Sequence, residues 1–323
     1  MSAFFNTIPA YFASALTMAF PMPLGQSVDP GSLTNPEGEI VNIDQDRAKR
    51  MTVPVSIEGK GPFTFVIDTG AERTVVSRNL VNRLSLEAEP PAELISIAGS
   101  SMVNMVYIPT LTMGTRDYNG LISPVLSAQS IGADGILGLD GLQDQRILFD
   151  FIADEITIED ASVAPKYSRR EIVITAKRKS GQLIFTDATI GGVKINVIVD
   201  TGAQISIANP VLQKRLLHRA KEIGEEDLLI AVTGQTLGVK FGKAKNFRIG
   251  RARFEQLTLA FADAPPFSRL GLNDEPTLLL GMDVLRKFDR VAIDFAQRKI
   301  HFLPPRDAQR LAPNGTTHSK IKS

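Results

Sequence analysis

Short apolar runs separated by turn-forming residues recur along most of the chain. Gly, Asn and Asp interrupt these runs every few residues, a pattern typical of strands. The pattern predicts four strands in the middle of each half of the chain. They are Leu94–Ala98, Met102–Ile108, Leu111–Met113 and Leu121–Leu126 in the first half, and Leu228–Val232, Leu237–Phe241, Phe247–Ile249 and Phe254–Phe261 in the second. The pattern therefore predicts an all-β protein with only short helices.

One segment of this pattern occurs twice. Residues 61–84 read GPFTFVIDTGAERTVVSRNLVNRL and residues 193–216 read VKINVIVDTGAQISIANPVLQKRL, with an identical Asp-Thr-Gly-Ala core displaced by 132 positions. Each copy predicts an apolar strand, a polar turn containing Gly, a β-branched stretch and then a helix. Ser77 and Asn209 are the expected N-caps of the two helices. The chain is therefore predicted to hold two copies of one structural unit.

The repeat continues in a second pair of motifs. GILGLD at 135–140 is echoed by LLLGMD at 278–283, and each is expected to run into a short helix with its Asp as the N-cap. A strand pair is expected after each motif, and the two pairs are Ile147–Phe151 with Glu155–Ile158 and Val291–Phe295 with Lys299–Phe302. Asp150 and Asp294 lie between apolar strand positions, so both are expected to be structural residues that face solvent.

The repeat sets the predicted domain boundaries. We predict two β-rich lobes over residues 47–164 and 165–305, followed by a disordered polar tail over 306–323. Residues 1–46 combine an apolar run at 10–20, of the length of a signal-peptide core, with a linker rich in Pro and Gly. Structure is expected to begin with the first lobe. A periplasmic or secreted location is expected, with the cytoplasm as the alternative because no Lys or Arg precedes the apolar run.

Composition and charge exclude several kinds of function. The 323 residues suffice for two compact domains, and 36 Lys and Arg against 35 Asp and Glu do not favour a nucleic-acid partner. The absence of Cys from the sequence excludes disulfides, thiol nucleophiles and cysteine-ligated metals. His218, His301 and His318 are scattered, so no metal site is expected. The apolar run near the N-terminus is too short for a stable membrane span.

The duplicated Asp-Thr-Gly is the candidate chemistry. A pseudo-twofold arrangement of the lobes would bring Asp68 beside Asp200. Two carboxyl groups about 3 Å apart cannot both ionise easily, so they would share a proton and act as an acid and a base. Such a pair can activate a water against a carbonyl group without a metal, a cofactor or a covalent intermediate.

The neighbours of the two aspartates suit the same role. Gly70 and Gly202 allow a tight turn and a close backbone approach to the carboxyl groups. Thr69 and Thr201 are expected to hydrogen-bond across the lobe interface and to hold the two turns at a fixed separation. One Asp-Thr-Gly alone is as readily a plain structural turn, since Asp bonds its own backbone. Two copies with matching downstream motifs favour a shared site.

These residues resemble the aspartic proteases of the pepsin and retropepsin clan. The Asp-Thr-Gly-Ala form after apolar residues is similar to the retropepsin variant, and Ile-Leu-Gly at 136–138 and Leu-Leu-Gly at 279–281 resemble the segment that passes behind the catalytic turn in that family. The resemblance covers most of residues 50–303. It implies an all-β, bilobal aspartic-protease fold whose two retropepsin-like lobes are related by a pseudo-twofold axis.

The resemblance also implies an activity and a set of site residues. It implies an aspartic endopeptidase with a peptide or protein substrate and no cofactor. Because both halves lie in one chain, a dimer is not required and a monomer is expected. The residues that it implies are Asp68 and Asp200 as the catalytic pair, supported by Thr69, Gly70, Thr201 and Gly202.

A flap in each lobe is a further implication of the resemblance. The best candidates are Gly-containing tips between apolar strands at 97–101 and 232–236. Their central residues are Ala98, Gly99, Ser100, Thr233, Gly234 and Gln235. These tips would fold over a bound peptide and exclude water.

Ala71 and Ala203 depart from the pepsin-like pattern, in which a Ser or Thr follows the Gly. Without that hydroxyl the carboxyl pair should hold its shared proton to higher pH, so we expect a pH optimum at about 5–6 rather than 2–3.

Two other functions stay open at the level of sequence. The chain could be a peptide-binding or sensor module that kept the fold without turnover. The two carboxyl groups could instead act on a glycoside, which requires a separation of about 5 Å or more. The sequence holds no Trp for stacking on a sugar, which disfavours the glycoside.

Overall fold

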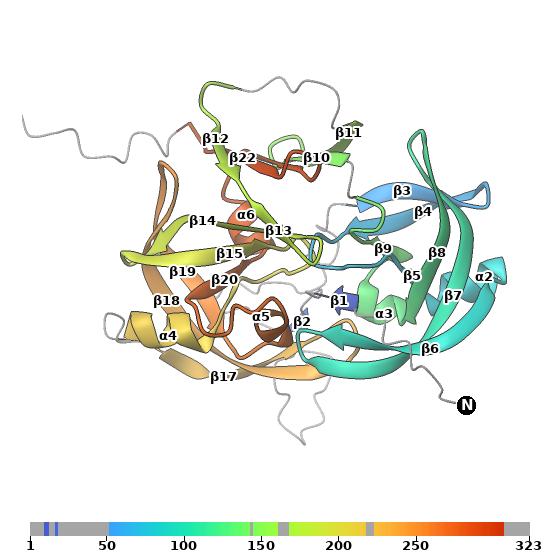
Figure 1. The fold of residues 1–323 in the computed structure, drawn as a ribbon, viewed down its shortest axis with the longest axis horizontal. Helices are drawn as coiled ribbons and strands as arrows, with labels where there is room; N and C mark the ends of the chain where they lie inside the picture. The colour runs from blue at the N-terminus through green and yellow to red at the C-terminus, as the bar shows by residue number, and fades with distance from the viewer. Residues whose placement is uncertain are drawn as a thin grey trace, which may run out of the picture.

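The computed structural model describes residues 10–12, 17–18, 52–142, 145–160, 168–217 and 223–306. Strands dominate, and they form two lobes that are joined by a third sheet (Figure 1). The predicted all-β, bilobal fold is confirmed. The predicted lobe boundary at 164/165 and the tail beyond Arg306 lie outside the described residues, as does the linker at 21–46.

The first lobe, called the N-lobe, is built on an eight-stranded sheet. Its order is β1-β6-β7-β3-β4-β9-β5-β8, and β7 also pairs with β8. The strands are β1 (Ala10–Phe12), β3 (Thr52–Ile57), β4 (Lys60–Ile67), β5 (Val75–Ser77), β6 (Glu87–Ser96), β7 (Gly99–Met113), β8 (Arg116–Leu126) and β9 (Gly135–Leu137), with helices α2 (Arg78–Leu84) and α3 (Ala128–Ile131). Ser77 caps α2 by accepting from the Leu80 amide, so the predicted N-cap is confirmed.

The second lobe, called the C-lobe, is built on a nine-stranded sheet. Its order is β13-β14-β15-β20-β16-β19-β18-β17-β2, and β14 also pairs with β18. The strands are β2 (Thr17–Met18), β13 (Lys177–Lys179), β14 (Gln182–Ile190), β15 (Val193–Val199), β16 (Ile207–Ala208), β17 (Ile223–Ile230), β18 (Thr236–Ile249), β19 (Ala252–Phe261) and β20 (Thr277–Leu280), with helices α4 (Pro210–Leu217), α5 (Pro265–Arg269) and α6 (Met282–Leu285). Asn209 accepts from the Leu212 amide at the start of α4, so this N-cap is also confirmed.

The two lobes repeat one topology. In the N-lobe β4 pairs with β9 in parallel, β9 pairs with β5 antiparallel, and β5 pairs with β8 in parallel. In the C-lobe β15, β20, β16 and β19 make the same three pairings in the same order. The sequence repeat therefore corresponds to a structural repeat, and its two Asp-Thr-Gly turns follow the equivalent strands β4 and β15.

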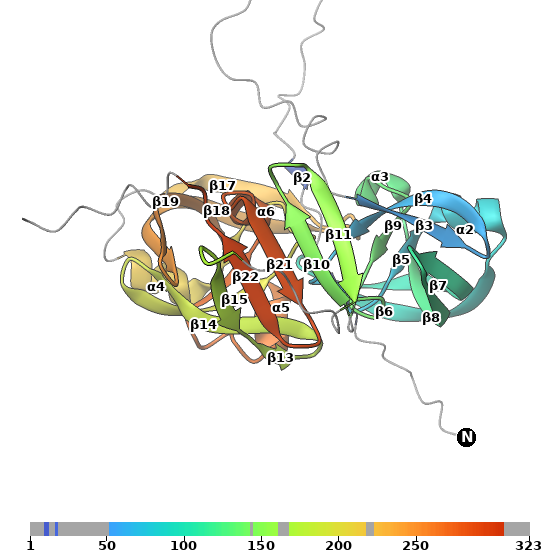
Figure 2. The same ribbon diagram turned by 90° about the horizontal axis from the view of Figure 1, so that it is seen from above.

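The third sheet joins the lobes. It has the order β11-β10-β21-β22-β12, and Figure 2 shows it lying across the junction between the two lobes. Its strands are β10 (Gln145–Asp150), β11 (Glu155–Asp160), β12 (Ile172–Thr175), β21 (Arg290–Asp294) and β22 (Lys299–Leu303). The two strand pairs predicted from the sequence thus combine through the antiparallel pairing of β10 with β21.

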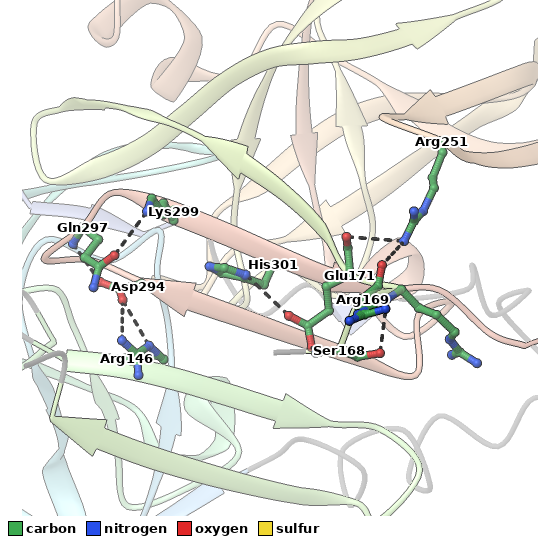
Figure 3. Close-up of polar contacts among 10 residues, drawn as sticks. Arg146, Ser168, Arg169, Glu171, Arg251, Asp294, Gln297, Lys299 and His301 are labelled. Atoms are coloured by element: carbon green, nitrogen blue, oxygen red, sulfur yellow. Dashed lines mark hydrogen bonds and ion pairs between the residues drawn. The ribbon is translucent and has the colours of Figure 1, made fainter. Parts of the chain in front are cut away.

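An ion pair is buried at this junction. The guanidinium of Arg146 donates to Asp294 Oδ2 at 2.9 and 3.0 Å, and both side chains are almost fully buried (Figure 3). The expectation that Asp294 faces solvent is wrong, because the cross-strand arginine allows its charge to be buried. Asp150 occupies the equivalent position and pairs with the half-exposed Arg290 at 2.6 Å. Nearby, burial lowers the pKa of His301 to about 4, so this imidazole is neutral at pH 7.

Three details of secondary structure differ from the expectation. Two pairs of predicted strands merge, because β7 and β18 each run without interruption through the predicted gap. Asp140 lies in a turn, and α6 has Gly281 as its N-cap with Asp283 in its first turn, so neither aspartate is an N-cap. Strands β1 and β2 lie ahead of the point where structure was expected to begin.

No helix in the described part of the chain is long and apolar enough to cross a membrane.

Candidate active site

The two Asp-Thr-Gly turns start where β4 and β15 end. The Asp68 amide donates to Leu137 O at 3.1 Å, and the Asp200 amide donates to Leu280 O at 3.0 Å. Each acceptor belongs to the parallel neighbour strand, β9 or β20, that carries the Leu-Gly motif. Within each lobe, the Asp-Thr-Gly motif and the Leu-Gly motif therefore form the turn together, as the resemblance implied for the segments at 136–138 and 279–281.

Backbone amides orient both carboxyl groups. Asp68 Oδ1 accepts from the amides of Gly70 and Ala71 at 2.8 and 3.1 Å. Asp200 Oδ1 accepts from the amides of Gly202 and Ala203 at 2.9 and 3.1 Å. The Oδ2 atoms of both aspartates are buried. Equivalent turns thus present two carboxyl groups in the same way.

The two carboxyl groups lie in direct contact at the lobe interface. Burial raises the pKa of Asp200 well above its usual value, and the negative charge of Asp68 and a hydrogen bond between the two side chains raise it further. Carboxyl groups in hydrogen-bond contact are closer than the separation of about 5 Å or more that glycoside hydrolysis needs. The pair therefore suits the sharing of one proton.

The threonines cross the interface as expected. Thr69 Oγ1 donates to Val199 O at 2.9 Å and accepts from the Thr201 amide at 3.1 Å. Thr201 Oγ1 donates to Ile67 O at 2.8 Å and accepts from the Thr69 amide at 3.1 Å. Four reciprocal hydrogen bonds in a buried place fix the separation of the turns.

Close packing of the backbone requires glycine in the Asp-Thr-Gly turn of the C-lobe and in both Leu-Gly segments. A Cβ on Gly202 would lie 2.2 Å from Asp68 Cγ, so the close approach of the two turns depends on this residue. A Cβ on Gly138 would lie 2.4 Å from the Arg73 backbone, and one on Gly281 would lie 2.8 Å from the Ile205 backbone. The Leu-Gly segments can therefore pass directly behind the turns.

A supporting pair of contacts was missed from the sequence. Thr74 Oγ1 donates to Asp140 Oδ1 at 2.7 Å and accepts from the Gly138 amide at 3.2 Å. Ser206 Oγ donates to Asp283 Oδ1 at 2.6 Å and accepts from the Gly281 amide at 2.9 Å. Burial raises the pKa of both Asp140 and Asp283. The repeat contained a sequence signal for these contacts. A hydroxyl residue follows the Asp of each Asp-Thr-Gly turn by six positions, and an Asp follows the Gly of each Leu-Gly segment by two.

The predicted flap residues lie at the tips of two hairpins. The β6–β7 hairpin turns at residues 97–98, and β17 and β18 are joined by residues 231–235. The two tips touch, since Gln235 Nε2 donates to Ser100 O at 2.9 Å and Thr233 Oγ1 lies 3.3 Å from Ser96 Oγ. These hydrogen bonds join the two lobes on the face opposite the shared sheet (Figure 1).

Each tip also inserts an apolar side chain into the other lobe. Ile97 is fully buried in a cluster otherwise formed by C-lobe residues, among them Ala203 and Leu229. Val232 is buried in a cluster otherwise formed by N-lobe residues, among them Ala71 and Leu94. The two hairpins are thus closed over the lobe interface, and the tip of each packs an apolar side chain into the opposite lobe, next to the Asp-Thr-Gly turn of that lobe.

A cavity of about 440 Å³ opens beside the N-lobe turn. It is lined by Glu72, Arg73, Leu139, Asp140, Ser180, Gly181 and Arg269. Burial raises the pKa of Glu72 to about 7. The positions equivalent to Glu72 and Arg73 in the C-lobe hold Gln204 and Ile205, so the two ends of the site differ chemically. Within the described residues, no cluster of His, Asp and Glu could hold a metal ion.

Each half of the repeat matches a known protein family. Residues 53–144 match the family described as "gag-polyprotein putative aspartyl protease". Residues 186–284 match the family described as "Aspartyl protease". Each match contains one Asp-Thr-Gly turn and its Leu-Gly partner. No curated protein matches the chain.

Proposed function

Both halves of this chain are retropepsin-like aspartic-protease lobes, and from that premise we propose that the protein is an endopeptidase that hydrolyses peptide bonds with Asp68 and Asp200. One observation carries the proposal: two buried carboxyl groups on matched turns lie in hydrogen-bond contact, and burial, together with the neighbouring charge of Asp68, raises the pKa of Asp200. A pair of this kind holds one proton between two oxygens over a range of pH, which is the state that hydrolysis requires.

The proposed mechanism uses the pair twice. A water between the carboxyl groups gives a proton to the ionised partner and attacks the carbonyl carbon, while the protonated partner hydrogen-bonds the carbonyl oxygen. The tetrahedral intermediate collapses when the C–N bond breaks and the amine nitrogen takes a proton from the pair. The new carboxylic acid and amine then leave. The Thr69 and Thr201 hydrogen bonds keep both carboxyl groups in position through these steps.

The closed hairpins would serve as the flaps of this enzyme. Ala98, Gly99 and Ser100 on one tip and Thr233, Gly234 and Gln235 on the other would cover the peptide and exclude water. Entry of a peptide would require the contact between Gln235 and Ser100 to open. Backbone hydrogen bonds from the hairpin strands would hold the peptide in an extended form.

Cleavage of a diverse peptide mixture from pH 3 to 8, read by mass, tests the proposal. We expect cleavage at apolar sites, and Asp200→Asn should lower the rate by on the order of 10³-fold or more, because the pair loses its base or its acid. Asp187→Asn, at an exposed aspartate on β14, is the matched control and should retain full activity. Full activity in a folded Asp200→Asn variant would rule out the proposed mechanism.

The same experiment addresses the binding-module alternative. If the wild-type protein is folded and cleaves no peptide at any pH, the proposed protease is wrong and a peptide-binding role becomes the better explanation. Peptides retained by the immobilised protein would then identify what the closed hairpins hold.

A further inference from the structure

A hairpin of the C-lobe reaches across the lobe interface to the Asp-Thr-Gly turn of the N-lobe. Strands β13 and β14 are joined by Ser180 and Gly181, which both have positive φ, as the two central residues of a type I′ turn do. Gly181 lies so close to Leu139 of the N-lobe that a Cβ on it would be 3.0 Å from Leu139 Cδ1. The next residue, Gln182, begins β14 and is almost fully buried. Gln182 is therefore held between the two lobes.

The side chain of Gln182 binds the N-lobe turn directly. Its Nε2 donates to Gly70 O at 2.9 Å, and this contact is buried. Its Oε1 is also buried and has no hydrogen-bond partner among the described residues. A buried amide oxygen without a partner costs free energy of folding, and such atoms are few in native proteins. A polar side chain kept at this cost beside the paired aspartates indicates a role beyond packing.

The hydrogen bond from Gln182 continues to the carboxyl group of Asp68. Gly70 O belongs to the same peptide group as the amide of Ala71, and this amide donates to Asp68 Oδ1 at 3.1 Å. A peptide group that accepts at its oxygen becomes a stronger donor at its N–H, because consecutive hydrogen bonds polarise one another. Gln182 thus strengthens a hydrogen bond to Asp68, and a stronger bond to a carboxyl oxygen favours the ionised form.

The C-lobe turn lacks this further link. The amides of its own turn donate to Asp200 at 2.9 and 3.1 Å, almost as the equivalent amides donate to Asp68 at 2.8 and 3.1 Å. Among the described residues, however, none donates to the carbonyl oxygen of Gly202. At the displacement of 132 positions, the first repeat holds Arg50, outside the described residues, in the place of Gln182. The two aspartates therefore differ in what stands behind their turns.

The protonation of the pair agrees with this difference. Burial raises the pKa of Asp200, and the negative charge of Asp68 and the hydrogen bond between the two side chains raise it further. The protonated form of Asp200 is thereby favoured next to an ionised Asp68. The other ionisable side chains around the two turns are Glu72, Arg73, Asp140 and Arg269 at the N-lobe turn and Asp283 at the C-lobe turn.

We propose that Gln182 is a positioning residue that determines which of the two aspartates carries the shared proton. Through the peptide group of Gly70 and Ala71 it keeps Asp68 ionised, so Asp68 is the base that takes a proton from the attacking water. Asp200 holds the proton that hydrogen-bonds the carbonyl oxygen of the peptide. This assignment rests on the proposed function for its catalytic meaning, whereas the position of the proton can be measured without any turnover.

Carbon-13 NMR of the aspartate carboxyl groups in the full-length protein tests the position of the proton. In the Asp200→Asn background Asp68 titrates without its coupled partner, and in the Asp68→Asn background Asp200 does the same. Gln182→Met keeps the approximate size of the side chain and removes the donor. It should raise the pKa of Asp68 by about 0.5–1 unit and leave the pKa of Asp200 unchanged. An unchanged pKa of Asp68, or an equal shift at both aspartates, would overturn the proposal.

Two further variants separate hydrogen bonding from packing. Gln182→Glu has the same shape, and its buried carboxyl group stays protonated at the pH where Asp68 titrates, so it keeps a donor toward Gly70 O. The pKa of Asp68 should therefore stay at its original value in this variant. Gln256→Met makes the same change as Gln182→Met at an exposed position of β19 and should shift neither aspartate.

A second measurement leaves Gln182 in place. In the Asp200→Asn background, the proton and nitrogen signals of the Gln182 side-chain amide should shift at the pH where Asp68 titrates, because the two groups are linked through one peptide group. The side-chain amide of the exposed Gln256 is the control and should show no such step. A Gln182 signal that does not respond to the titration of Asp68 would contradict the proposed link.

Cleavage rates separate this inference from the proposed function. With both aspartates present, Gln182→Met should move the acid limb of the profile of kcat/KM against pH to higher pH by about 0.5–1 unit, with KM unchanged. A purely structural loss would lower the rate at every pH without moving the limb. If peptides are cleaved but neither the limb nor the pKa of Asp68 responds, the protease stands and the role of Gln182 is wrong. If the pKa of Asp68 responds but no peptide is cleaved, the position of the proton stands and the protease is wrong.

Discussion

The chemistry of the site depends on two carboxyl groups, those of Asp68 and Asp200, each of which is oriented by two backbone amides of its own turn. Asp68, Asp200, Thr69 and Thr201 could be predicted because they lie in an identical four-residue core that occurs twice. The hydroxyls of Thr74 and Ser206 were missed, because they differ between the copies and their acidic partners are distant in sequence. The burial of Asp294 was missed because its partner lies on a strand of the other lobe.

The first prediction concerns how the stability of the folded protein depends on the ionisation of Asp200. The raised pKa of Asp200 means that the folded protein keeps a proton that the unfolded chain loses above the ordinary Asp value, so stability falls as pH rises through that window. Asp200→Asn cannot ionise and escapes this loss. Thermal unfolding should therefore show the variant to be more stable than the wild type at pH 7, with a smaller difference at pH 4. A less stable variant at pH 7 would contradict this account.

The second prediction concerns the pH dependence of cleavage. The wild type should be most active at about pH 5–6. Ala203→Ser places a hydroxyl beside a carboxylate that already accepts from the residue 203 amide, and a bond to the ionised form lowers its pKa. The upper limb of the profile of kcat/KM against pH should move to lower pH by about 0.5–1 unit. Ala208→Ser, at a buried alanine on β16, is the control. A wild-type maximum near pH 2 would refute the expectation.

Among the elements, those built on local patterns could be predicted and those completed by distant partners could not. The paired strands, Gly-containing turns and helix caps follow from short-range sequence signals. The merging of predicted strands into β7 and β18 does not, because continuous pairing with neighbouring strands carries each across its polar interruption. Strands β1 and β2 exist through pairing to β6 and β17, so an apolar run of ambiguous type gave no hint of them.

The hairpin tips give a prediction at the scale of elements. Ile97→Ala removes a fully buried side chain from the C-lobe cluster, a change that costs about 2–5 kcal/mol in a protein core. We expect the tip to detach before the lobe unfolds, so the loss should be seen as faster hydrogen exchange at residues 97–101 and at Gln235. Met102→Ala, on the same hairpin and 67% exposed, should leave exchange unchanged. Equal exchange in both variants would show that Ile97 does not hold the tip.

For the whole molecule, the sequence predicted two lobes but not how they are joined. Both strand pairs of the third sheet were expected, yet their union through β10 and β21 depends on a pairing over about 140 residues that no local pattern encodes. The contact of the two hairpin tips is equally long-range. The lobes are therefore joined at two opposite faces, with the carboxyl pair between them.

The two equivalent ion pairs of the third sheet, one buried and one half-exposed, give a prediction about stability. Asp294→Ala leaves the buried Arg146 charge without its main partner and should cost about 3–5 kcal/mol in urea unfolding at pH 7. Asp150→Ala breaks the equivalent pair with Arg290, whose side chain is 52% exposed, and should cost about 1 kcal/mol or less. Similar losses in the two variants would mean that burial does not distinguish the pairs.

The residues at the two ends of the site differ, and this difference bears on the direction in which a peptide would bind. A peptide has a direction, whereas a perfectly twofold groove would offer identical surroundings to either orientation of the chain. Here Glu72 and Arg73 line one end, and Gln204 and Ile205 hold the matching places at the other. A peptide bound by the proposed protease would therefore meet two ionisable side chains on one side of the carboxyl pair and none at the equivalent places on the other side. The two halves of the proposed protease would thus distinguish the amino side of a peptide from its carboxyl side.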